Sequence, residues 1–203
     1  MTNHTRWHGA EAHLAACDPV LARIIDAYGH CTLKPQADYF AVLCESIVSQ
    51  QLAVKASDAI YARFAAHCGG SPTPDALLAT APEKLRELGL SGKKAEYMHD
   101  LAACFHRGVI TPAAFPAMTD AEIIAQLTAV KGIGVWTAHM FLIFALNRPD
   151  ILPVGDYGVR KAFLLSYGLD AMPGARLMES IALPWRPWRS IASWYLWRSL
   201  ENK

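Results

Sequence analysis

Two glycines, Gly132 and Gly134, separate two stretches of the chain that both have the apolar spacing of a helix. Residues 119–127 begin with the Thr-x-x-Glu pattern of a capping box, which marks a helix start. Residues 134–146 form a second apolar helix pattern. Glycine takes a positive φ easily and lets another backbone approach closely, so a tight hairpin between two helices is predicted. The N–H groups at the start of the second helix would suit a phosphate.

The rest of the chain also repeats apolar residues at helical spacing, and no stretch alternates as a strand does. We therefore predict the all-α class. The expected helices cover residues 11–28, 38–67 with an interruption at 49–51, two short helices within 73–88, then 93–107, 119–127, 134–146, 157–167, 175–183 and 187–200. Apolar residues make up 53% of the chain and charged residues 18%, a balance that favours a packed core over disorder.

The net charge and the cysteines limit how the protein could bind nucleic acid, metals or membranes. The net charge is only +1, so nucleic-acid binding would depend on a local patch and on backbone amides. The five cysteines are scattered, and no pair has metal-ligand spacing, which indicates a reduced interior. No apolar run approaches the roughly 20 residues of a membrane span. We expect a soluble intracellular protein without a membrane partner, in the cytoplasm or nucleoid if bacterial and in the nucleus if eukaryotic.

The string LTAVKGIGVWTA around the two glycines resembles the hairpin of the helix-hairpin-helix DNA glycosylase superfamily. The later string PVGDYGVRK resembles the segment that carries this superfamily's catalytic aspartate. From about Asp18 to Trp197, the chain is similar to the alkylation-repair branch, the 3-methyladenine DNA glycosylase II family. The resemblance implies two helical lobes with an active-site cleft between them. One lobe would be residues 36–147, and the other would combine residues 1–35 with 148–203.

The resemblance also implies a monofunctional DNA glycosylase of base excision repair. Such an enzyme, expected here as a monomer, flips alkylated purines of the 3-methyladenine or 7-methylguanine type from double-stranded DNA and hydrolyses the N-glycosidic bond. Lyase-type relatives place a lysine at the position of Trp136, and an indole cannot form a Schiff base. Two alternatives stay open: a glycosylase for other lesions, such as hypoxanthine or etheno adducts, and a non-catalytic damaged-DNA-binding module.

Asp156 stands at the start of a predicted helix, where a carboxylate caps N–H groups and its negative charge is favoured. Glycosidic cleavage builds positive charge on the sugar, and an ionised carboxylate beside it stabilises that charge. The resemblance matches Asp156 to the family's catalytic aspartate, a role that is compatible with ordinary helix capping. The base pocket that the resemblance implies is lined by Trp136, Trp197, Gln50, Met140 and Tyr157.

Aromatic faces attract a cation by roughly 0.5–2 kcal/mol, and an alkylated purine carries positive charge. Trp136 and Trp197 are therefore expected to stack the base, with ordinary core packing as the alternative for Trp136. Met140 stands where the family has another pocket aromatic, which would change the shape of the pocket.

The interruption Ser49-Gln50-Gln51 matches the family's wedge, the segment that fills the gap left by an extruded base. Gln51 is the expected wedge and Leu52 the alternative, although a polar break in a helix has the same composition. The DNA backbone is expected to contact the hairpin residues Lys131, Gly132, Ile133 and Gly134.

Cofactor expectations follow from the same resemblance. Relatives hold Na⁺ or K⁺ at the hairpin through backbone carbonyls, which here would be those of Thr128, Val130 and Ile133. Some relatives hold an iron–sulfur cluster on four cysteines after the catalytic segment. No cysteine follows Cys104, so no cluster is expected.

Overall fold

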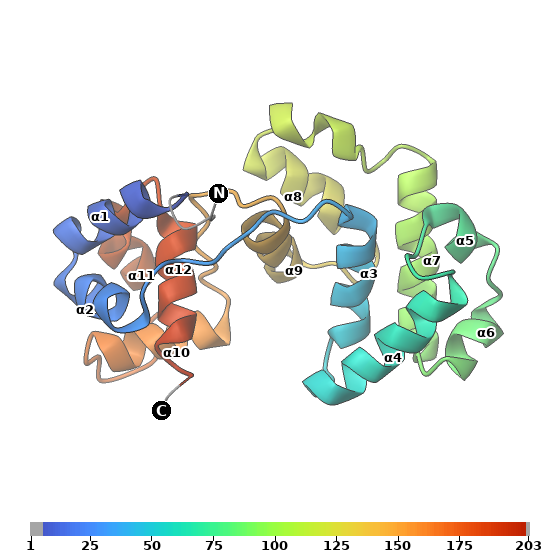
Figure 1. Ribbon diagram of the computed structural model, residues 1–203, viewed down its shortest axis with the longest axis horizontal. Coiled ribbons are helices and arrows are strands. Elements are labelled where there is room, and N and C mark those ends of the chain that lie inside the picture. Colours follow the sequence, from blue (N-terminus) through green and yellow to red (C-terminus); the bar gives the residue numbers. More distant parts are fainter. Residues whose placement is uncertain (1–5, 202–203) are drawn as a thin grey trace. The chain divides into compact units, whose positions relative to one another are not determined.

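The computed structural model describes residues 6–201, and all the regular structure in that range is helical (Figure 1). The predicted all-α class is confirmed, because no strand occurs among these residues. Within the same range, no helix is long and apolar enough to cross a membrane. Contacts divide the chain into two compact units, Gln36–Phe141 and Met1–Pro35 with Leu142–Lys203. The sequence placed the later boundary after residue 147, whereas these contacts place it at 141.

The unit Gln36–Phe141 is built around the helix α7 (Gly92–His106). Its elements are α3 (Tyr39–Ser49), α4 (Val54–His67), α5 (Pro74–Leu78), α6 (Pro82–Glu87), α7 (Gly92–His106), the 3-10 helix η2 (Pro112–Ala117), α8 (Asp120–Thr128) and α9 (Val135–Met140). Helices α3, α5 and α6 all pack on α7 (Figure 1). The core includes Leu43, Phe64 and Leu101, which are fully buried. Burying a side chain of this size contributes about 1.5–3 kcal/mol to folding.

Polar side chains set where these helices begin. The hydroxyl of Thr119 accepts the N–H of Glu122, and the Glu122 carboxylate accepts the N–H of Thr119, so the predicted capping box is present. Ser91 likewise caps α7 by accepting the N–H of Lys94. Each cap satisfies N–H groups that a helix start leaves without an intrahelical acceptor.

The other unit collects the two ends of the chain. It contains α1 (His8–Cys17), α2 (Pro19–Tyr28), α10 (Tyr157–Ser166), α11 (Ala175–Ile181), the 3-10 helix η4 (Leu183–Trp185) and α12 (Arg189–Arg198). Helix α12 packs against α1, α2 and α10, so it forms the centre of this unit (Figure 1). Trp185 and Tyr195 are its largest fully buried side chains.

The single helix predicted for residues 11–28 is wrong, because the chain breaks at Asp18. Its Oδ1 accepts the N–H groups of Val20 and Leu21 at 2.8 and 3.1 Å, which starts a new helix. Pro19 follows at the first helical position, where its missing N–H costs nothing.

The helix predicted for residues 134–146 also changes along its length. α9 ends at Met140, and Phe141–Ala145 is a π-helix. The chain then turns at Asn147, which has a φ of +52° and whose Nδ2 donates to the carbonyl of Ile143 at 3.0 Å. This hydrogen bond ties the turn to the end of the segment. The apolar spacing of the sequence is compatible with either winding, so it could not reveal the change.

Candidate functional site

Asp156 is the N-cap of α10, as expected, and is only 7% exposed. Its Oδ1 accepts two hydrogen bonds, from the N–H of Val159 at 2.7 Å and from Nε1–H of Trp197 at 2.9 Å. Its own N–H donates to the carbonyl of Pro153 at 2.9 Å, which fixes the turn that leads into the helix. One backbone amide and one indole therefore orient this carboxylate.

Gly158 is a site residue that the sequence analysis missed. A Cβ at this position would lie 3.0 Å from Cδ1 of Trp197 and 3.1 Å from Oδ1 of Asp156. Only a glycine leaves the indole and the carboxylate room to meet without a shift. The signal was present in the string Gly-Asp-Tyr-Gly, but a glycine in the first turn of a helix gives no sign of what packs above it.

Trp197 is half-buried in α12, and its ring lies 5.4 Å from that of Phe144 at an interplanar angle of 36°. Its indole therefore contacts an aromatic ring while its N–H points to Asp156. Tyr157 is the first residue of α10 and is 70% exposed. Both of these expected pocket residues belong to the same unit as Asp156.

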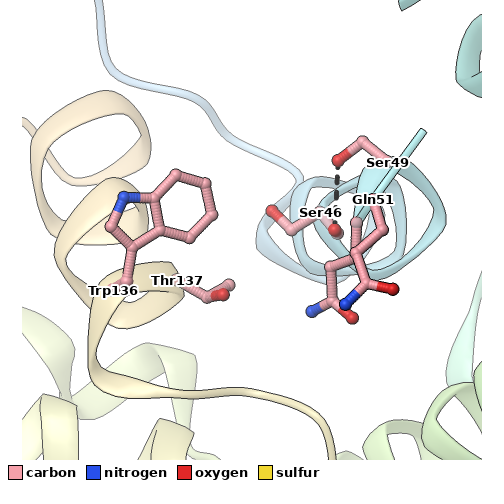
Figure 2. A pocket seen from close by; sticks show the side chains of 6 residues that line it. Ser46, Ser49, Gln51, Trp136 and Thr137 are labelled. Atoms are coloured by element: carbon pink, nitrogen blue, oxygen red, sulfur yellow. Dashed lines mark hydrogen bonds between the residues drawn. The ribbon is translucent and has the colours of Figure 1, made fainter. Parts of the chain in front are cut away.

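A cavity of about 350 Å³ lies in the unit Gln36–Phe141, between the end of α3 and the start of α9 (Figure 2). It is lined by Ser46, Ser49, Gln50, Gln51, Trp136 and Thr137. Figure 2 shows Trp136 and Thr137 on one helix, across the cavity from Ser46, Ser49 and Gln51. Trp136 is half exposed, so core packing does not account for its indole. The volume is near the lower end of the range for small-molecule sites, about 300–1,000 Å³.

The turn at the end of α3 has an unusual backbone. Gln50 has φ −51° and ψ 126°, Gln51 has φ +58°, and the N–H of Leu52 donates to the carbonyl of Ser49 at 3.1 Å. This is the pattern of a type II turn, whose third position favours glycine or asparagine. Gln51 and Leu52 are both exposed, with Leu52 at 40%.

Two long side chains support this turn. Nζ of Lys94, in α7, lies 2.7 Å from the carbonyl oxygens of both Val48 and Gln50. Nε2 of Gln50 donates to the carbonyl of Gly132 at 2.9 Å, which joins the turn to the hairpin. Burial lowers the pKa of Lys94. No sequence pattern indicates this role of Lys94, because 44 positions separate it from Gln50 and its helix face carries no motif.

The two hairpin glycines differ. Gly132 has φ +80°, and a Cβ there would lie 2.2 Å from Cδ2 of Tyr97, so the hairpin rests directly on this ring. Gly134 has φ −96° as the N-cap of α9, and a Cβ there would meet nothing within 4 Å. The expectation of special backbone geometry therefore holds at Gly132 and is wrong at Gly134.

Lys131 is exposed, but both its backbone and its side chain are bonded to α7. Its N–H donates to Oδ2 of Asp100 at 2.8 Å, and its Nζ forms an ion pair with Oε1 of Glu96 at 2.8 Å. The hydrogen bond and the charge of Glu96 raise the pKa of Lys131. Ile133 is buried, and its N–H donates to the carbonyl of Val130 at 3.1 Å.

Among residues 6–201, two places have oxygen or nitrogen atoms that could be considered as ligands of a cation. At the hairpin, the carbonyl of Val130 already accepts a hydrogen bond from Ile133, and the Thr128 hydroxyl donates to the carbonyl of Ile124 at 2.7 Å. In the other unit, the ligand atoms of His8, Glu11 and His30 lie within 4.8 Å of one another.

Structural hydrogen bonds already account for the Glu11 carboxylate. It accepts the N–H of Cys31 at 2.8 Å, the hydroxyl of Tyr195 at 3.1 Å and a bond from His30 at 3.0 Å. Burial raises the pKa of Glu11, but these hydrogen bonds outweigh burial and leave its pKa below the usual value. A buried anion satisfied in this way needs no ion.

The structure thus brings together some of the expected residues. Trp136, Gln50 and Gln51 line one cavity, while Asp156 and Trp197 are joined by a hydrogen bond in the other unit. Met140 is half-buried at the end of α9 and is not part of the cavity lining.

Comparison with known proteins gives a consistent set of matches. Residues 44–187 match the family model described as HhH-GPD superfamily base excision DNA repair protein. An alkylbase DNA glycosidase-like protein of Schizosaccharomyces pombe is 30% identical, and the match covers 98% of this chain and 96% of that protein.

Two solved structures are similar along nearly their whole length. The 3-methyladenine DNA glycosylase of Schizosaccharomyces pombe, in complex with abasic DNA, has a TM-score of 0.84 and 30% identity, and the match covers 94% of this chain and 96% of that one. The DNA-3-methyladenine glycosidase of Bacillus halodurans has a TM-score of 0.87 and 33% identity, over 97% and 91%.

Proposed function

The chain belongs to the HhH-GPD superfamily of base excision DNA repair proteins, and from this premise we propose that it is a DNA glycosylase for alkylated bases. Its substrates are purines of the 3-methyladenine and 7-methylguanine type in double-stranded DNA. It hydrolyses the N-glycosidic bond, leaves an abasic site and has no lyase step. The names of its relatives support this substrate class, since several are DNA-3-methyladenine glycosylases.

The observation that carries the proposal is the buried, oriented carboxylate of Asp156. In the reaction, the bond between C1′ and the purine nitrogen breaks and its electron pair goes to the base. An alkylated purine is cationic, so it leaves as a neutral molecule. The positive charge that develops on the sugar is stabilised by Asp156. Water then bonds to C1′, and its proton passes to the same carboxylate.

Stacking supplies the recognition of the base. We propose that Trp136 and Trp197 contact the flipped purine, because an indole face attracts a cation by roughly 0.5–2 kcal/mol. Gln50 and Tyr157 complete the proposed pocket, with Met140 where relatives have an aromatic side chain. Gln51 fills the space that the extruded base leaves in the duplex, and Leu52 lies beside it.

We propose that the hairpin binds the DNA backbone chiefly through amides. Lys131 is already paired with Glu96, and its N–H is bound by Asp100. The N–H groups of Gly134 and the residues after it open α9, where a helix has no acceptor of its own to offer them. A monovalent cation on the carbonyls of Thr128, Val130 and Ile133 would add to this contact, with the protein acting as a monomer.

The test is the release of free base from an oligonucleotide duplex that contains one 7-methylguanine. The wild type should release the base, and Asp156→Asn should be slower by about 10²–10³-fold, the usual effect of losing a transition-state charge partner. Asparagine is also a good N-cap, so the variant should fold and melt like the wild type. If the asparagine variant keeps the wild-type rate, the catalytic assignment is wrong.

Two further substrates distinguish the alternatives. Release of hypoxanthine or ethenoadenine in preference to 7-methylguanine would assign a different lesion class. Tight binding of a lesion duplex by wild type without any release of base would indicate a damage-binding module instead.

A further inference from the structure

The turn that carries Gln51 has an unfavourable backbone. A non-glycine residue at φ +58° is in the left-handed region, where its Cβ crowds the following carbonyl. Such a conformation persists only where surrounding contacts determine it, and it concentrates at functional sites. Gln51 is exposed, so packing of its own side chain does not hold it there. The cause of the conformation must lie in the neighbouring backbone.

That backbone is anchored by a single ammonium group. The last carbonyls of a helix have no intrahelical donor and carry the negative end of the helix dipole. Here Lys94 Nζ lies 2.7 Å from the carbonyl of Val48 in α3, and 2.7 Å from that of Gln50 in the turn. These two oxygens stand on either side of Ser49. One cation therefore fixes the direction in which the chain leaves α3.

Gln50 provides a second anchor at the other side of the turn. Its Nε2 donates to the carbonyl of Gly132 at 2.9 Å, so its side chain is held by the hairpin. Gln50 and Gln51 also line both the cavity beside Trp136 and a second cavity of about 230 Å³ beside Lys94. The turn therefore lies between the two cavities. Lys94 fixes it on one side, and the bond from Gln50 to the hairpin fixes it on the other.

We propose that Lys94 is a positioning residue for base extrusion, which together with Gln50 holds the Ser49–Leu52 turn so that Gln51 enters the DNA duplex. This inference rests on the proposed glycosylase function. Lys94 itself contacts neither the base nor the sugar. Lys94 acts on the step in which a paired base leaves the DNA duplex, because a side chain that fills the vacated space offsets the loss of base stacking.

The experiment compares one lesion in two settings. Single-turnover release of 7-methylguanine is measured in a fully paired duplex and in the same duplex with a three-base unpaired bubble around the lesion. Extrusion from the bubble requires little unstacking, so a positioning defect should appear only in the paired duplex. Lys94→Met keeps the length of the side chain and removes its donors. Lys94→Arg keeps the charge, and Lys93→Met removes an exposed charge from the same helix.

Lys94→Met should lower the rate on the paired duplex by about tenfold or more, because it loses both hydrogen bonds from the ammonium group to the turn, and should leave the bubble rate within about twofold. Lys94→Arg should recover most of the paired rate, and Lys93→Met should match the wild type. Equal losses on both substrates, or an equal loss in Lys93→Met, would overturn the inference. Folding of each variant is checked first by its circular dichroism spectrum and melting temperature, so that a loss on both substrates by a folded variant counts against the inference.

A second readout separates this inference from the proposed function. A 2-aminopurine placed next to the lesion becomes more fluorescent when the neighbouring base leaves the stack. If wild type releases no base but still raises this signal, and Lys94→Met does not, the hydrolytic function fails and the positioning role stands. If both proteins raise the signal equally, the positioning role is overturned whatever the rate of base release.

Discussion

The carboxylate of Asp156 and the backbone turn at Gln51 are held in opposite ways. Asp156 is buried, and the first turn of its own helix and an indole packed over Gly158 fix it. Gln51 is exposed on a turn with an unfavourable φ, and Lys94 in α7 and the hairpin carbonyl that Gln50 reaches hold that turn from outside. At Asp156, the close packing around Gly158 leaves no room for an added atom. At Gln51, the turn loses its support only if a hydrogen-bond donor such as Lys94 is removed. Substitutions should therefore affect the two sites through different steps.

The largest expected effect is at the hairpin that anchors Gln50. Gly132→Ala would place a Cβ 2.2 Å from the Tyr97 ring at a φ of +80°. Strain and overpacking together should lower the free energy of unfolding by on the order of 3 kcal/mol, measured by urea denaturation. Gly134→Ala is the matched control, because its Cβ would meet nothing and its φ is −96°. Similar losses in both variants would contradict the contact with Tyr97.

A smaller effect is expected where the indole orients the carboxylate. Trp197→Phe keeps an aromatic ring and removes the 2.9 Å hydrogen bond to Asp156. The rate of base release should fall about tenfold, equally for paired and bubble substrates, because the loss acts on the chemical step. Trp194→Phe, half-buried in the same helix, is the control and should retain the rate. A loss confined to the paired duplex would place Trp197 with the wedge instead.

The smallest effect comes from relieving the strained turn. Gln51→Gly should raise the free energy of unfolding by about 1 kcal/mol, because glycine takes a positive φ without a steric cost. The same variant should be several-fold slower on paired DNA and unchanged on the bubble. Gln51→Ala keeps the strained backbone and removes the amide, so it should lose the same activity without gaining stability. A stability gain in both variants would mean that φ is not the cause.

Sequence patterns were sufficient for features that depend on neighbours in the chain. The helical class, the capping box at Thr119 and the capping position of Asp156 all follow from local spacing. The break at Asp18 was missed because the apolar spacing continues through it, although Asp-Pro is itself a helix-start signal. The winding change after Met140 was missed because a π-helix and an α-helix bury similar apolar runs.

The supporting residues of the site could not be found in this way. Lys94 acts on a turn far along the chain, and Tyr97 matters because Gly132 leaves room for its ring. Gly158 matters because of an indole in another helix. Each of these roles is a relation between distant segments, and no single stretch of sequence encodes it. Lys131 shows the converse, since this exposed cation in the motif is already paired with Glu96, which no local pattern indicates.

The hydrogen bond between Trp197 and Asp156 has a consequence for how this protein would discriminate among bases. In the proposed mechanism, the indole of Trp197 both stacks on the base and orients the carboxylate that stabilises the charge on its sugar. A base that tilts the Trp197 ring would therefore also turn the Asp156 carboxylate away from the sugar. Purines that fit the pocket badly would react slowly even where they bind well. Discrimination among bases would then appear in the rate of base release rather than in the binding affinity.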